Sequence, residues 1–113
     1  MDKTVWKIVF YNDHRGKSPA LDFIEELPTI DQVKVRNALR LLREFGTNLG
    51  MPHAKQIKGK LWELRPGGVR LFYFAYIAHQ FVILHGYRKQ GMKAPEREIE
   101  IALRRMEELL EEV

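Results

Sequence analysis

The chain has 113 residues, of which 30% are charged and 45% are hydrophobic, and its formal net charge is +4. This length and composition predict one folded domain, residues 1–113, with a hydrophobic core of its own. The absence of cysteine excludes disulfide and thiolate chemistry and fits a reducing compartment. The sequence shows no apolar run of membrane-spanning length and no signal-peptide pattern, so we expect a cytoplasmic protein without membrane contact.

The positive charge is concentrated in one part of the chain. Between Met51 and Lys93 there are eight lysines and arginines but only one acid, Glu63, which gives this window a net charge of +7. Residues 95–113, in contrast, carry a net charge of −4. A concentrated positive field favours a polyanion such as nucleic acid as the partner. Basic loops that merely keep the protein soluble are the alternative interpretation.

The first predicted element is a strand from Val5 to Tyr11, which is apolar on both sides and is therefore expected inside a sheet rather than at its edge. A helix should follow it. Ser18 is suited to cap this helix, Pro19 suits its first position, and Pro28 ends it. Its buried stripe is predicted to be Ala20, Leu21, Ile24 and Leu27.

A second helix is predicted to begin at a capping box formed by Thr29 and Gln32 and to end at Gly46. Because so few residues join the two helices, they should form an antiparallel hairpin that packs on a sheet. The segment from Gly46 to Gly59 contains three glycines and a proline, which indicates a loop. The buried stripe of the second helix is predicted to be Val35, Ala38, Leu39, Leu42 and Phe45.

Three antiparallel strands are predicted after this loop. The runs Leu61–Arg65, Val69–Ala78 and Phe81–Arg88 are rich in β-branched and aromatic residues. Gly67 and Gly68 supply a tight turn between the first two runs, and a weaker turn signal separates the second from the third. The middle run is almost wholly apolar, as expected of a central strand.

A helix that begins at Pro95 is predicted to end the chain. Its apolar residues recur at spacings of three and four, which favours packing against the sheet, with the binding of a partner as the alternative. The predicted fold class is therefore α+β, with an N-terminal strand, a helical hairpin, a three-stranded antiparallel meander and a C-terminal helix. The stripe consists of Ile99, Ala102, Leu103, Met106, Leu109, Leu110 and Val113.

The register of the first hairpin decides whether two arginines meet. A two-residue turn at Gly67 and Gly68 places Arg65 directly opposite Arg70. Like charges in this position repel each other unless an anion lies between them. Alternation along the strand puts Glu63 on the same face.

The register of the second hairpin decides which further groups join this face. A two-residue turn at Ala78-His79 places Tyr87 opposite Arg70 and His85 on the same face. A slip by one residue would replace both of them by Arg88. The sequence leaves the two registers open.

The chain lacks several kinds of catalytic motif. It has no P-loop, no dinucleotide fingerprint and no metal-ligand spacing, and its four histidines are scattered. A basic face with one candidate acid–base histidine suits cleavage of an RNA phosphodiester without a metal or cofactor. A base takes the 2′-OH proton, arginines stabilise the phosphorane, and an acid protonates the leaving 5′ oxygen. A histidine that is only packed into the sheet is the alternative for His85.

Two stretches of the sequence resemble a known family. LWELRPGGVRLFYF, residues 61–74, and ILHGYRKQGMKAPEREIEIALRRMEEL, residues 83–109, closely resemble the phage-derived, HigB-like branch of the RelE/ParE toxin superfamily. The resemblance extends over nearly the whole chain. It implies a type II toxin–antitoxin toxin: an mRNA interferase, or endoribonuclease, that cuts mRNA on the ribosome and is neutralised by a helix-turn-helix antitoxin.

The resemblance also implies roles for individual residues. Arg70 begins the strand that is expected to contact the scissile phosphate, Arg65 ends the strand before it, and the HG-x-x-K segment supplies His85 and Lys89. These four are the candidate catalytic residues. The candidate RNA-binding residues are Lys58, Lys60, Tyr87, Arg88 and Lys93.

The chain departs from RelE toxins proper at two places. The first hairpin strand carries Trp62 and Glu63 where those toxins have lysines, and no tyrosine follows Tyr87. The general base of RelE is therefore not transferable to this chain. Two rival functions stay open, a gyrase inhibitor of the ParE type and a non-enzymatic module that binds RNA or an antitoxin. The HG-x-x-K segment favours the interferase.

Overall fold

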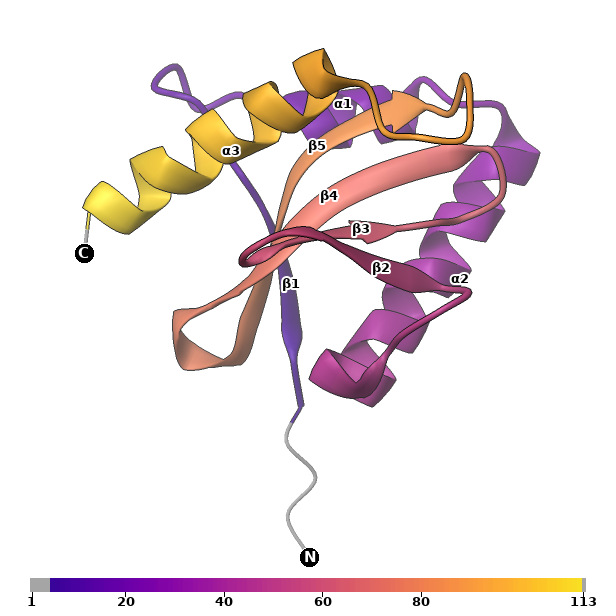
Figure 1. The fold of residues 1–113 in the computed structure, drawn as a ribbon, viewed down its shortest axis with the longest axis horizontal. Helices are drawn as coiled ribbons and strands as arrows, with labels where there is room; N and C mark the ends of the chain where they lie inside the picture. The colour runs from indigo at the N-terminus through magenta and orange to yellow at the C-terminus, as the bar shows by residue number, and fades with distance from the viewer. Residues whose placement is uncertain (1–4, 113) are drawn as a thin grey trace, which may run out of the picture.

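The computed structural model describes residues 5–112. A five-stranded sheet forms its centre, in the order β1-β5-β4-β3-β2, with β1 parallel to β5 and the other neighbours antiparallel. Figure 1 shows the elements in place. In chain order these are β1 (Lys7–Phe10), α1 (Pro19–Glu25), α2 (Thr29–Phe45), a 3-10 turn (Gly46–Asn48), β2 (Ala54–Lys58), β3 (Leu61–Leu64), β4 (Val69–Tyr76), a 3-10 turn (Ile77–His79), β5 (Gln80–Arg88) and α3 (Glu96–Glu111).

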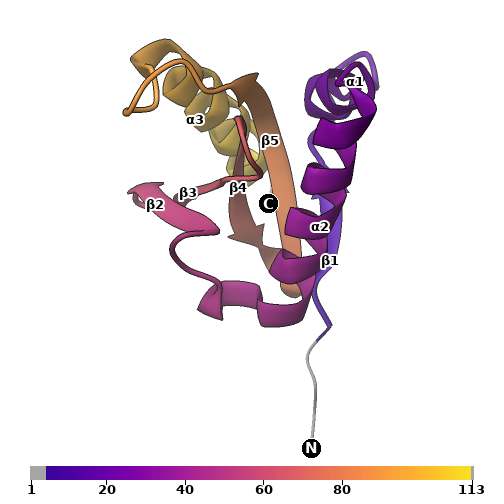
Figure 2. The ribbon, with the colours of Figure 1, turned by 90° about the vertical axis from the view of Figure 1, so that its right-hand side faces the viewer.

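The helices cover the sheet from both sides, α1 and α2 on one face and α3 on the other (Figure 2). Alternation along β4 explains the two cores. Leu71 and Tyr73 face the helical hairpin, whereas Phe72 and Phe74 face α3. The central strand is buried on both faces, and the predicted α+β order of elements is confirmed.

The N-terminal half of the chain differs from the predictions in three respects. The β1 strand lies at the edge of the sheet, because its parallel pairing with β5 places it outside the meander. The side chain of Gln32 donates to the carbonyl oxygens of Glu25 and Leu27 instead of closing a capping box, so it bridges the helical hairpin. The side chains of Leu21 and Phe45 are exposed rather than buried.

The segment predicted as a loop contains a strand. Residues Ala54–Lys58 form β2, which pairs with β3. The sequence AKQIK shows no β-rich pattern because most of its side chains point to solvent at the sheet edge. At the other end of the chain α3 begins after Pro95 as predicted, and Val113 lies outside the described residues.

The second hairpin adopts one of the two registers that the sequence leaves open. Its turn has three residues, Ile77–His79, but Leu84 forms a bulge that restores the pairing of Phe72 with His85 and of Arg70 with Tyr87. Beyond His85 the strand needs Gly86. An added Cβ there would lie 2.6 Å from the Phe23 ring, so the glycine lets α1 pack closely on β5.

No helix within residues 5–112 is long and apolar enough to cross a membrane.

Candidate active site

Four polar side chains meet on the α3-facing side of the sheet, where β3, β4 and β5 approach the Pro66–Gly68 turn. We call Glu63, Arg65, Arg70 and Tyr87 the arginine cluster. The observed pair of Leu64 with Leu71 confirms the register of the first hairpin. The pair of Arg70 with Tyr87 decides between the two registers left open for the second, and all four groups lie on one face. The prediction that Arg65 and Arg70 lie near each other is confirmed, because both form ion pairs with the same carboxylate oxygen.

Glu63 lies at the centre of the cluster. Its Oε1 atom is 3.8 Å from Arg65 Nε and 3.9 Å from Arg70 Nε. Its Oε2 atom accepts a hydrogen bond of 2.8 Å from the Tyr87 hydroxyl. Burial, together with this hydrogen bond to a carboxylate, raises the pKa of Tyr87. Tyr87 is therefore a poor proton acceptor in this arrangement.

Arg70 is the buried arginine of the pair. It is 6% exposed, and its Nη1 atom donates to the carbonyl oxygens of Gly67 and Val69 at 2.7 and 2.9 Å. Burial and the neighbouring Arg65 lower the pKa of Arg70. The guanidinium thus binds the turn through two backbone carbonyls, and its charge is buried within the arginine cluster.

Arg65 is the accessible arginine of the pair. Its side chain is 23% exposed, and its Nη1 atom contacts the sulfur of Met51 at 3.4 Å. Its Nε atom is buried and has no hydrogen-bond partner among the described residues. A buried N–H without a partner is costly. The accessible part of the Arg65 side chain therefore lies elsewhere on the guanidinium than at Nε.

His85 belongs to a second group, which we call the histidine cluster: His85, Glu98 and Arg105. The Nε2 atom of His85 lies 2.6 Å from Glu98 Oε1, and its Nδ1 atom lies 3.3 Å from Arg105 Nη1. Arginine can only donate, so Nδ1 is the acceptor and Nε2 carries the proton toward Glu98. Burial lowers the pKa of His85 in spite of the carboxylate.

Polar contacts hold α3 over this cluster. Arg105 donates to the carbonyl oxygen of Leu84 at 2.8 Å and lies over the Tyr11 ring, 5.4 Å from its centroid. The Tyr11 hydroxyl donates to Glu108, and the Tyr76 hydroxyl donates to the backbone of α3. The packing role predicted for α3 is confirmed. Glu98 and Arg105 were not among the predicted site residues, since charges on a helix with an apolar stripe usually face solvent.

The remaining predicted cations are exposed and do not form one group. Lys89 follows β5, and its backbone N–H donates to Gly68, which places it beside the turn of the arginine cluster. Arg88 forms an ion pair with Asp31 of α2 at 3.3 Å, and Lys93 lies in the segment before α3. Lys58 and Lys60 flank the β2–β3 turn, at the opposite end of β3 from Arg65.

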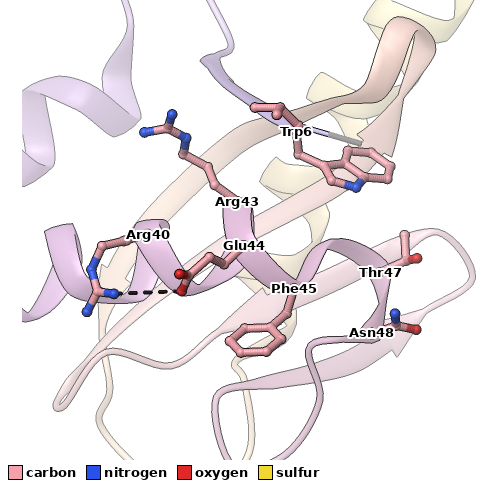
Figure 3. Close-up of a pocket in the computed structure, with 8 residues that line it drawn as sticks. Trp6, Arg40, Arg43, Glu44, Phe45, Thr47 and Asn48 are labelled. Atoms are coloured by element: carbon pink, nitrogen blue, oxygen red, sulfur yellow. Dashed lines mark ion pairs between the residues drawn. The ribbon is translucent and has the colours of Figure 1, made fainter. Parts of the chain in front are cut away.

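A hollow of about 530 Å³ that includes no residue of either cluster lies where the end of α2 meets the segment before β1 (Figure 3). Its lining combines exposed apolar groups such as Phe45 with arginines, one of which, Arg40, already pairs with Glu44 at 3.7 Å. None of the candidate catalytic residues lines it. Within residues 5–112, no group of three or more His, Cys, Asp or Glu side chains is placed to hold a metal ion.

The chain matches the family model described as "Phage derived protein Gp49-like (DUF891)" over residues 22–107. It belongs to this Gp49-like family. The matched range begins in α1 and ends in α3, so it includes both polar clusters. No curated protein sequence matches the chain.

Two solved structures show that this Gp49-like protein has a RelE-like fold. One is a chain of the RelBE2 toxin–antitoxin complex from Mycobacterium tuberculosis, with 20% identity and a TM-score of 0.55, covering 76% of this chain and 100% of the other. The second is a mutant of the E. coli toxin RelE in the free state, with 19% identity and a TM-score of 0.56, covering 91% of this chain and 99% of the other. At this identity the likeness defines the fold alone.

Proposed function

We propose that this Gp49-like protein is the toxin of a type II toxin–antitoxin system and that it cleaves mRNA on the ribosome as an endoribonuclease. The observation that carries the proposal is the arginine cluster: two guanidiniums lie on one sheet face beside one carboxylate, and one of them is partly accessible. The RelE-like fold and the family match support it. The expected site of action is the cytoplasm, with residues 1–113 acting as one toxin domain.

The proposed reaction needs charge stabilisation and two proton transfers. The 2′-OH loses its proton to a base, the 2′ oxygen attacks phosphorus, and the bond from phosphorus to the 5′ oxygen breaks. An acid gives that oxygen a proton, so the products are a 2′,3′-cyclic phosphate and a 5′-OH end. Arg65 and Arg70 stabilise the negative charge that builds up on the phosphorane oxygens.

His85 and Lys89 are the two candidates for proton transfer. His85 must exchange its contact with Glu98 or Arg105 for one with the substrate, whereas Lys89 is exposed beside the turn. The pH profile of single-turnover cleavage separates them. If His85 transfers the proton, His85→Gln removes a limb below about pH 6.5, the ordinary titration range of histidine. If Lys89 does so, that limb stays and Lys89→Ala lowers the rate.

The proposed protein partner is a helix-turn-helix antitoxin encoded beside the toxin. This partner is suggested by the RelBE2 structure, which contains a toxin-antitoxin complex. Expression of the chain alone should arrest growth, and co-expression with the adjacent small gene should restore it. Persistent arrest in the presence of that gene would contradict the pairing.

One pair of assays tests the proposed activity against its rivals. Purified protein is added to ribosomes programmed with a defined mRNA, and in parallel to a gyrase supercoiling reaction. New 5′-OH ends on the mRNA with unaffected supercoiling would support the interferase. Inhibited supercoiling without cleavage would identify a ParE-like activity. If neither assay responds while the chain binds RNA or its antitoxin, the protein is a binding module.

A further inference from the structure

Glu63 is a buried acid surrounded by cations. It is 5% exposed, and residues 51–93 contain no other acid. Acidic side chains are rarely buried to this degree unless they are paired, because removing a carboxylate from water is expensive. The proposed reaction uses the arginines that surround Glu63 but assigns nothing to the carboxylate itself. Its burial therefore needs an explanation in terms of its contacts.

The contacts of Glu63 with the two arginines balance charge without using guanidinium N–H donors. At 3.8 and 3.9 Å from the Nε atoms of Arg65 and Arg70, the carboxylate is within ion-pair distance but beyond hydrogen-bond distance. The hydrogen bond from Tyr87 fixes the other oxygen. Arg65 Nε accordingly keeps an unused N–H donor in the part of the chain that the structure describes.

We propose that Glu63 is a positioning residue: held by Tyr87, its carboxylate keeps Arg65 and Arg70 side by side without hydrogen-bonding to either, so that the accessible part of Arg65 stays available to a phosphate. Without this anion the two like charges repel each other across the hairpin. Each guanidinium then turns independently, and the pair no longer presents a single site. The catalytic consequence of this inference rests on the proposed function, whereas the arrangement of the arginines can be tested without RNA.

The first test records the Nε–H signals of the arginines by NMR, with Arg65→Lys and Arg70→Lys used to assign them. Glu63→Gln keeps the shape of the side chain and can accept from Tyr87, but it removes the charge. In this variant both signals should shift and exchange faster with water, while the Arg105 signal stays in place. Glu107→Gln, which changes an exposed acid of α3, is the matched control and should alter neither signal.

Unmoved Arg65 and Arg70 signals in a folded Glu63→Gln protein would overturn the inference. Should that variant not fold, Glu63→Asp replaces it. Aspartate keeps the charge, but its side chain is one methylene shorter than that of glutamate. Both arginine signals should therefore shift in the direction expected for Glu63→Gln, by a smaller amount. Unchanged signals in Glu63→Asp would be equally decisive against positioning.

The second test separates chemistry from binding. Single-turnover cleavage is measured at saturating RNA, and affinity is measured with RNA that carries a 2′-deoxy nucleotide at the scissile position. Glu63→Gln should lower the cleavage rate by about 10²-fold, the order of loss expected when reacting groups are displaced. The affinity should change little. A wild-type rate, or equal losses of rate and affinity, would refute the positioning role.

Failure of the proposed function gives a different pattern. If the wild-type chain cleaves no RNA, with or without ribosomes, the endoribonuclease proposal is refuted. The arginine signals then decide by themselves whether Glu63 holds the arginine pair.

Discussion

The arginine cluster and the histidine cluster lie on the same face of the sheet but differ in how far their polar groups are already satisfied. In the arginine cluster, two guanidiniums share one carboxylate at ion-pair distance, and the buried Nε donor of Arg65 has no partner within residues 5–112. In the histidine cluster, both ring nitrogens of His85 have partners from α3. The first cluster keeps one partly accessible guanidinium, that of Arg65, whereas the second is closed by α3, which packs over it.

This difference bears on the two parts of the proposed reaction, which are charge stabilisation and proton transfer. Charge stabilisation needs donors that are fixed before the substrate arrives. In the arginine cluster, Glu63 lies within ion-pair distance of both guanidiniums, and the turn carbonyls hold Arg70. Proton transfer by His85 needs a ring nitrogen within hydrogen-bond reach of the substrate. In this structure Glu98 and Arg105 occupy both positions.

The largest effect is expected for Arg70→Ala. Loss of a donor that acts on transition-state charge typically lowers the rate by about 10²–10³-fold, so single-turnover cleavage should fall by this amount while binding of non-cleavable RNA is nearly unchanged. Arg70 also holds the turn through Gly67 and Val69, so the melting temperature must be measured alongside. Arg40→Ala, which removes an exposed arginine of α2, is the control and should cleave normally. Equal rates for the two variants would contradict the role.

A smaller effect, on stability, is expected for Tyr87→Phe. This change leaves the buried Oε2 atom of Glu63 without its donor, which should cost about 1–3 kcal/mol of unfolding free energy. Tyr76→Phe is the matched control, since its hydroxyl donates to a backbone carbonyl at the end of α3 and not to a carboxylate. Denaturant unfolding of both variants should rank Tyr87→Phe as the less stable. The opposite order would show that the Glu63 contact is weak.

The histidine cluster predicts a modest pH dependence of stability. Burial lowers the pKa of His85 below its ordinary value of 6.5, so below that pH the unfolded chain binds a proton that the folded chain does not. The free energy of unfolding should therefore decrease as the pH falls from about 6.5. In His85→Gln this part of the decrease should be absent. If the wild type and the variant lose stability in parallel between pH 7.5 and 5.5, the closed histidine cluster is not maintained in solution.

Much of this arrangement could be predicted from the sequence because short-range rules fix it. The Gly67-Gly68 turn sets the first hairpin, and strand alternation then brings Glu63, Arg65 and Arg70 to one face. Two registers are open for the second hairpin from the sequence, and the structure adopts the one that pairs Arg70 with Tyr87. The bulge at Leu84 compensates for a three-residue turn, and no local pattern in an apolar run marks such a bulge.

The contacts of α3 could not be predicted because they depend on tertiary packing. The apolar stripe fixed which side of the helix faces the sheet but not how far along the sheet it lies, and that position decides whether Glu98 reaches His85. The burial of Arg70 is not predictable for a similar reason, since a cation on a strand is usually solvated. The β2 strand has no recognisable signal in the sequence, because an exposed edge strand needs no apolar alternation.

The smallest effect is expected outside both clusters, at Lys58 and Lys60. Both side chains are exposed and lie at the far end of β3 from Arg65, so they should add attraction to the RNA backbone without taking part in the chemistry. Replacing both with alanine should weaken RNA binding and reduce the slope of log K against log salt by about 0.7 for each lysine removed. Cleavage at saturating RNA should be unchanged. The control is the double variant Lys7→Ala and Lys17→Ala, which removes the same charge from exposed positions outside the meander. If Lys58→Ala with Lys60→Ala instead lowers the saturated rate, the reacting phosphate lies nearer the β2–β3 turn than the arginine cluster.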